Sequence, residues 1–214
     1  MKNLEHTDKW SVADPHLFWG EIAPTEHIVQ IYENDDIFLD LLEGFVINGL
    51  KSGDCVVIIA TETHIDHLNF RLAGAGIDID AVVADGQYIP LDAEQALSEF
   101  MVNGWPDAKL FYKTISRIVN RAKQKDRRLR AFGEMVAILW AQGLSGATVH
   151  LETLWNRFCE TEALCLFCAY PKAGFTQDVS SSMHTICCTH SKIISGEHDS
   201  KSQILYRPTL KTAG

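Results

Sequence analysis

Short apolar runs alternate along the chain with segments in which apolar residues recur every three or four positions. Residues 27–32, 55–60 and 163–170 are apolar or nearly apolar runs of strand length. A continuous apolar run is typical of a parallel strand that is buried on both faces. The recurring pattern, as in Ile65, Leu68 and Leu72, is typical of an amphipathic helix. Strands that alternate with helices predict an α/β domain with a central, mostly parallel sheet and helices on both faces.

The other expected elements follow from the same two patterns. Further short strands are expected at residues 81–84, 87–91 and 129–134. Helices are expected over residues 36–50, 64–73, 92–101, 111–122 and 151–158, with one more beginning near Val136.

The segment from Arg130 to Trp140 combines a strand, a tight glycine turn and a short apolar helix. The turn delivers the carboxylate of Glu134 to the carboxyl end of a strand that we expect in the middle of the sheet. Ligands of open α/β sheets bind at that end. Glu134 can also stabilise the N-terminus of the following helix, and the two roles are compatible. We therefore predict Glu134 as a polar anchor of a ligand pocket.

Polar side chains also follow the first two strands. Tyr32 ends the first strand, and Thr61 and His64 follow the second, so they are expected at the same edge of the sheet as Glu134. The alternatives are that Tyr32 fills the core and that Thr61 only caps a helix. A pocket for an apolar molecule also needs aromatic walls around a few polar groups. The predicted ligand-binding residues are His27, Tyr32, Thr61, His64, Glu134, Trp140 and Asn156.

Charge and composition limit the possible partners. The 214 residues are 46% hydrophobic and carry a formal net charge of −9, so a folded core is expected and direct binding to nucleic acid or to an anionic membrane is not. The basic cluster between Arg121 and Arg130 is expected to end a helix. The N-terminus lacks the apolar core of a signal peptide, and no run approaches the roughly 18 apolar residues of a membrane span. We expect a cytoplasmic protein.

The six cysteines are expected to be reduced thiols. Cys165 and Cys168 lie three apart on a strand and point to opposite faces, so they cannot share a metal or a disulfide. A second group offers four nitrogen or sulfur ligands in seven residues, but its spacing matches no common structural zinc site: His184, Cys187, Cys188 and His190. No metal and no cofactor is predicted, and a metal or redox role for that group stays open.

Several segments together resemble one known family. These are residues 18–20, 27–32, 49–53, 132–136, 151–156 and 168–171, with 186–187 and 190–191 near the end. In this order and spacing they resemble the MEDS family, the methanogen/methylotroph sensory domain seen in a regulator of dichloromethane degradation. The resemblance implies a three-layer fold related to the RecA/KaiC ATPase core. It also implies a small-molecule sensor that acts on histidine kinase or DNA-binding output modules.

With this resemblance the chain divides into an N-terminal arm (1–17), a sensory domain (18–190) and a polar C-terminal tail (191–214). An active RecA-like ATPase has a glycine-rich loop with Lys and Ser or Thr after its first strand. Residues 32–36 here hold no glycine, no lysine and three carboxylates, which would repel a triphosphate.

We therefore expect a sensory module rather than an enzyme. It would bind a small organic ligand in a degenerate crevice and regulate a partner kinase or transcriptional regulator. The alternatives are an enzyme that uses Glu134 as an acid or base, and an interaction scaffold without a ligand.

Overall fold

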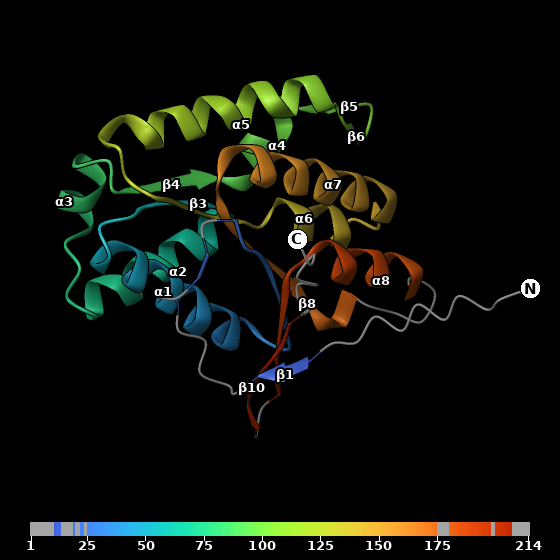
Figure 1. Ribbon diagram of the computed structural model, residues 1–214, viewed down its shortest axis with the longest axis horizontal. Helices are drawn as coiled ribbons and strands as arrows, with labels where there is room; N and C mark the ends of the chain where they lie inside the picture. Colours follow the sequence, from blue (N-terminus) through green and yellow to red (C-terminus); the bar gives the residue numbers. More distant parts are fainter. Residues whose placement is uncertain are drawn as a thin grey trace, which may run out of the picture.

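The computed structural model describes residues 11–13, 19, 22–23, 25–174, 180–197 and 200–206. One sheet runs through the domain in the order β1-β10-β9-β2-β8-β7-β3-β4 (Figure 1). The six strands from β9 to β4 are parallel, and β10 and β1 add an antiparallel edge. The strands are β1 (Ser11–Ala13), β2 (His27–Tyr32), β3 (Cys55–Ala60), β4 (Tyr88–Asp92), β7 (Leu129–Gly133), β8 (Cys165–Pro171), β9 (Lys192–Glu197) and β10 (Ser200–Tyr206).

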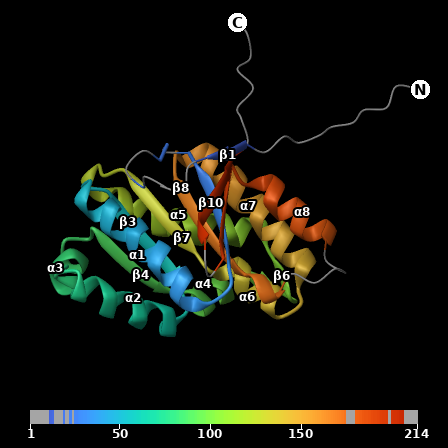
Figure 2. The same cartoon turned by 90° about the horizontal axis from the view of Figure 1, so that it is seen from below.

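Helices cover both faces of the sheet. One face carries α1 (Asp35–Lys51), α2 (Glu62–Gly74) and α3 (Ile79–Ala84), and Figure 2 looks onto α1 and α2. The other carries α4 (Ala93–Ser98), α5 (Ala108–Ala122), α6 (Met135–Ala141), α7 (Ser145–Glu162) and α8 (Ser180–Thr189). A small hairpin of β5 (Met101–Val102) and β6 (Trp105–Pro106) follows α4, and single 3-10 turns follow α5 and β8, η2 (Lys123–Lys125) and η3 (Lys172–Gly174). The predicted three-layer α/β architecture is confirmed.

The apolar run of β3 is explained by burial on both faces. Val56 and Ile58 point into the core under α1 and α2, whereas Val57 and Ile59 point into the core under α4 to α7. The side chains of strand β8 alternate between the two cores in the same way. Cys165 and Cys168 therefore lie in different cores, as their spacing predicts.

Two expected elements differ from the structure. Residues 81–84 form the end of helix α3, not a strand, because the side chain of Asp78 accepts a hydrogen bond from the Ala81 N–H at 3.0 Å and starts a helix. The segment expected as a polar tail from residue 191 begins with a strand. Strand β9 pairs in parallel with β2, and Ile194 is fully buried, so the sheet continues beyond residue 190.

Most of the expected N-terminal arm lies outside the described residues. Within it, residues 11–13 form β1, which pairs with β10. Trp19 is buried against Phe45 and Phe167. Among the described residues, no helix has the length and apolar content needed to cross a bilayer.

Candidate functional site

Glu134 lies at the carboxyl end of β7, directly before α6. Its side chain connects the β7–α6 junction to the β3–α2 junction. Its Oε2 accepts the backbone N–H of Thr61 at 2.8 Å and the Thr61 hydroxyl at 3.3 Å. Its Oε1 lies 2.7 Å from Nδ1 of His64, in the first turns of α2. The parallel strands β7 and β3 are neighbours, so their carboxyl ends bring these groups together. We call this group of three residues the Glu134 clamp.

The clamp is largely removed from solvent. The side chains of His64 and Glu134 are 13% and 8% exposed. The hydrogen bond that His64 makes to Glu134 raises the pKa of His64. Burial lowers this pKa, and the charges of Glu134 and Asp35 raise it further. His64 therefore holds its proton to a higher pH than a free histidine, and a protonated ring donates to Glu134 from Nδ1.

Tyr32 reaches the clamp from β2. Its ring stacks on Phe38 at 5.0 Å, and Phe38 meets the ring of His64 edge-on at 5.0 Å. Burial, followed by the charges of Glu134 and Asp35, raises the pKa of the Tyr32 hydroxyl. The structure thus brings together four of the predicted residues from three strand ends: Tyr32, Thr61, His64 and Glu134.

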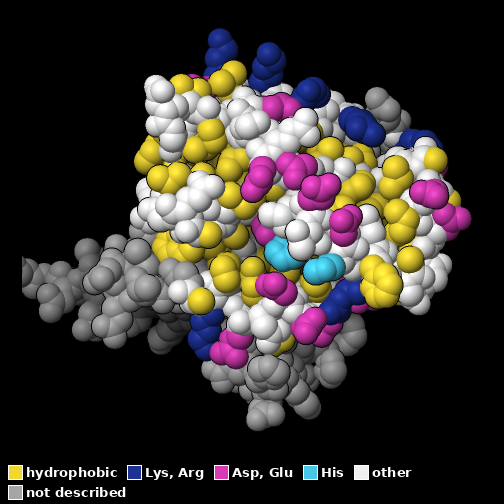
Figure 3. Space-filling view, turned by 180° about the vertical axis from the view of Figure 1, so that it is seen from behind, with side chains coloured by type: hydrophobic (Ala, Val, Ile, Leu, Met, Phe, Trp, Pro, Cys, Tyr) yellow, Lys and Arg dark blue, Asp and Glu magenta, His cyan; other side chains and the backbone are white. Residues whose placement is uncertain are grey.

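The surroundings of the clamp are acidic. Figure 3 shows acidic side chains gathered near the middle of one face of the molecule, with histidine side chains among them. Glu33, Asp35 and Glu62, which follow β2 and β3, are exposed. The turn after β2 is capped by Asn34, whose side chain accepts from the Ile37 N–H at 3.0 Å, so this helix N-terminus has a side-chain partner of its own. A phosphate group would meet carboxylates here.

A hollow of about 390 Å³ lies between α4 and α6, and its lining residues do not belong to the clamp. Both helices begin at carboxyl ends of strands, so the hollow lies at the same edge of the sheet as the clamp. Most of its lining is apolar, with a few polar groups: Glu94, Leu97, Ser98, Met101, Gly104, Ile138, Leu139, Gln142 and Leu144. Sequence reasoning missed this feature, because it depends on how two short helices splay apart.

Trp140 is on α6 but faces inward. It is 5% exposed and meets Tyr170 of β8 edge-on at 6.2 Å. It therefore lines neither the clamp nor the hollow, and packs in the core between α6 and the sheet.

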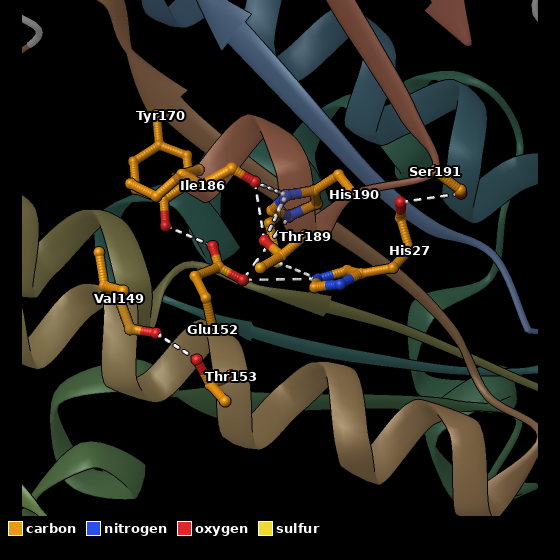
Figure 4. Close-up of polar contacts among 10 residues, drawn as sticks. His27, Val149, Glu152, Thr153, Tyr170, Ile186, Thr189, His190 and Ser191 are labelled. Carbon is orange, nitrogen blue, oxygen red and sulfur yellow. Dashed lines mark hydrogen bonds and ion pairs between the residues drawn. The ribbon is translucent and has the colours of Figure 1, made fainter. Parts of the chain in front are cut away.

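His27 and Asn156, the remaining predicted residues, lie at a different place. His27 begins β2 on the side of α7, where its Nε2 lies 3.6 Å from Oε2 of Glu152 and 3.5 Å from Sγ of Cys168. Figure 4 shows the carboxylate of Glu152, on α7, directed toward the rings of His27 and His190. Asn156, one helical turn after Glu152, donates to Glu160 at 3.1 Å. We call His27, Glu152, Cys168 and His190 the buried cluster.

Burial sets the protonation of this cluster. It raises the pKa of Glu152 to about 8, which a hydrogen bond from Tyr170 partly opposes. Burial lowers the pKa of His190 to about 4. Burial also lowers the pKa of His27, and the neighbouring His190 lowers it further. Around neutral pH the carboxyl group is mostly protonated and the imidazoles are neutral.

The four candidate ligands that lie close together in the sequence do not form one site among the described residues: His184, Cys187, Cys188 and His190. Among the described residues, His190 turns into the buried cluster, whereas Cys188 contacts His184 at 3.5 Å, one turn away on α8. The residues that His190 meets in the buried cluster are 22 or more positions away in the sequence.

The fold defines the class of protein. A KaiC-like protein from the archaeon Pyrococcus horikoshii superimposes with a TM-score of 0.59 at 11% identity, covering 88% of this chain and 83% of that one. A second P. horikoshii protein gives 0.55 at 11% identity, covering 94% of each chain. The flagellar accessory protein FlaH from Methanocaldococcus jannaschii gives 0.53 at 9%, covering 82% and 73%. At these identities the likeness shows the fold alone: a RecA/KaiC-like three-layer domain.

The family follows from the sequence match. A model described as the MEthanogen/methylotroph, DcmR Sensory domain, MEDS, matches residues 26–191. The chain belongs to this family, and membership indicates a sensory role. No curated protein matches the chain.

Proposed function

We propose that this protein is a sensory module that binds a small, mostly apolar organic molecule in the hollow between α4 and α6 and transmits binding through the Glu134 clamp. The observation that carries the proposal is the position of α6. Glu134 precedes its first residue, while Ile138 and Leu139 within the helix and its C-cap residue Gln142 line the hollow. One helix of 7 residues thus joins a pocket wall to a polar clamp.

The hollow has the chemistry of a small-molecule site. Ligand pockets commonly measure roughly 300–1,000 Å³ and combine apolar walls with a few polar groups. Leu97, Met101 and Leu144 supply apolar walls, and Ser98 and Gln142 supply hydrogen-bonding groups. Glu94 disfavours an anionic ligand, so we expect a neutral or cationic molecule.

The clamp supplies the two states that a sensor needs. A ligand shifts a conformational equilibrium only when it binds one state better than the other. The backbone N–H of Glu134 donates to Ile59 at 2.8 Å, and its carbonyl accepts from Ala137 and Ile138 in α6. A shift of α6 therefore pulls on Glu134, which holds Thr61 and the start of α2. The acidic face around α1 and α2 is where a partner kinase or transcriptional regulator would detect the change.

A thermal-shift screen of small organic molecules tests the proposal. A ligand that binds only the native state raises the melting temperature. For a molecule that does so, Ser98→Phe should abolish the shift, because the ring fills part of the hollow. Gln95→Phe on the same helix is the matched control: it adds the same ring outside the lining and should leave the shift intact.

Glu134→Gln separates binding from transmission. The variant should still bind the ligand, but ligand should no longer change amide hydrogen exchange at Thr61 and the first turn of α2. If Glu134→Gln abolishes binding while Ser98→Phe does not, the ligand contacts Glu134 directly and the hollow is the wrong site. A screen with no shift at all would favour the scaffold, and turnover of ATP with magnesium would favour an enzyme.

A further inference from the structure

The buried cluster has no role in the proposed sensing route, yet it is the one group of three or more candidate metal ligands found among the described residues. We propose that His27, Glu152, Cys168 and His190 bind a single zinc-like divalent transition-metal ion. The prediction from sequence of no metal site missed this group, because its members come from β2, α7, β8 and the turn after α8.

The spacing of the ligand atoms fits tetrahedral coordination. Zinc bonds of about 2.0–2.1 Å to nitrogen and oxygen and about 2.3 Å to sulfur place neighbouring ligand atoms roughly 3.3–3.6 Å apart. His27 Nε2 and His190 Nε2 each lie 3.6 Å from Oε2 of Glu152, and His27 Nε2 lies 3.5 Å from Sγ of Cys168. All four ligand atoms lie within 4.8 Å of one another, so only a small contraction is needed.

Hydrogen bonds at their other polar atoms orient two of the ligands. Nδ1 of His190 lies 2.6 Å from the carbonyl oxygen of Ile186, to which it donates, so its Nε2 keeps a free lone pair toward the cluster. Tyr170 donates to Oε1 of Glu152 and leaves Oε2 directed at the two imidazoles (Figure 4). His190 and Glu152 are each held by their other polar atom, as is typical of metal ligands.

Without an ion, the polar atoms of the cluster are poorly satisfied. Oε2 of Glu152 and Nε2 of His190 are buried and find no hydrogen-bond partner among the residues that the structure describes. An unsatisfied buried polar group costs about 1–3 kcal/mol. An ion would satisfy both atoms at once.

The charges also balance. Binding would remove the protons of Glu152 and Cys168, and a carboxylate and a thiolate would neutralise a divalent ion held by two neutral imidazoles. The resulting complex has no net charge, which suits a fully buried position. Imidazole and thiolate ligands favour zinc over magnesium or calcium.

Cobalt binding to the full chain tests the proposal. Tetrahedral Co²⁺ with a cysteine ligand gives visible d–d bands and a thiolate-to-metal charge-transfer band. Stripped protein should bind about one equivalent of Co²⁺ with both features, and Zn²⁺ should displace it. Cys168→Ser should lose the charge-transfer band. Cys165→Ser, three residues away on the same strand but in the other core, is the matched control and should retain it.

Glu152→Gln keeps the shape of the side chain and an oxygen that can accept from Tyr170, so it protects the test against misfolding. It should reduce Co²⁺ affinity at least tenfold while circular dichroism remains native. Retention of the charge-transfer band in Cys168→Ser, or the absence of tetrahedral Co²⁺ bands in wild type, would overturn the proposal. The test is independent of the hollow, because Ser98→Phe should leave cobalt binding unchanged.

Discussion

The Glu134 clamp should contribute measurably to stability, and Glu134→Gln is the change that tests this. Glutamine has nearly the same shape but no charge and only one acceptor oxygen. It cannot accept from both Thr61 and His64, and its NH₂ group would face a donor. Hydrogen bonds to charged groups contribute about 1.5–3 kcal/mol each, and neighbouring contributions are not additive. We expect the variant to lose about 2–3 kcal/mol of unfolding free energy.

The assay is urea and thermal unfolding followed by circular dichroism. In a domain of this size a loss of about 1 kcal/mol lowers the melting temperature by roughly 2–4 °C, so a decrease of about 5–10 °C is expected. Glu162→Gln is the control. Its carboxylate pairs with Lys123 at 2.7 Å on the surface, where such pairs contribute about 0–1 kcal/mol. If the unfolding free energy of Glu134→Gln lies within about 0.5 kcal/mol of the wild-type value, the clamp does not stabilise the fold as expected.

The pH dependence has a defined sign. The pKa of His64 is raised above 6.5 in the folded state. The contribution of the His64–Glu134 pair to the free energy of unfolding is therefore complete below pH 6.5 and is lost as pH rises through the folded-state pKa. The stability difference between wild type and Glu134→Gln should therefore shrink as pH rises above about 6.5 and through the raised pKa of His64. A difference that grows over this range would show that His64 is not the charged partner.

Three further substitutions test the packing around the sheet. Asp54→Asn should cost about 3–5 kcal/mol in urea unfolding, because Arg130 is 2% exposed and would keep its buried charge without the carboxylate at 2.5 Å. Gly49→Ala should cost about 1–3 kcal/mol, because the new Cβ would lie 2.7 Å from Cγ2 of Val56. Ala163→Gly should stabilise by about 0.5 kcal/mol, because Ala163 ends α7 with φ 49°, where glycine has no steric cost.

The first two of these substitutions have matched comparisons. Asp85→Asn removes a surface carboxylate paired with Lys125 and Arg127, and should change stability far less than Asp54→Asn. Gly74→Ala, where the added Cβ meets nothing within 4 Å, should be neutral or stabilising. Equal effects within either pair, or a destabilised Ala163→Gly, would contradict the packing described above.

The clamp was accessible to sequence reasoning. Glu134, Thr61 and His64 all follow strands that had been recognised from their apolar runs. The carboxyl ends of neighbouring parallel strands meet at one edge, so the grouping needed only the order of the elements. What the pattern could not show was that Glu134 is saturated by hydrogen bonds and nearly buried, which favours a clamp over an open ligand anchor.

The error at residues 81–84 has a local cause. A four-residue run of alanine and valine gives the same signal in a short helix as in a strand, and the decisive information was the cap at Asp78, outside the run. The inward direction of Trp140 could not be predicted either, because α6 has apolar residues on most of its surface and its sequence does not show which side faces the sheet.

The sequence by itself determined where most of the strands and helices lie, that the sheet is mostly parallel and that the turn after β2 has no phosphate-binding loop. These properties depend on side-chain periodicity and local charge, which are written along the chain. The tertiary structure alone decided that α6 connects a hollow to the clamp and that β9 extends the sheet. It also decided that His27 meets Glu152, Cys168 and His190. Contacts between residues more than a hundred positions apart depend on how whole layers pack, and no local pattern encodes that distance.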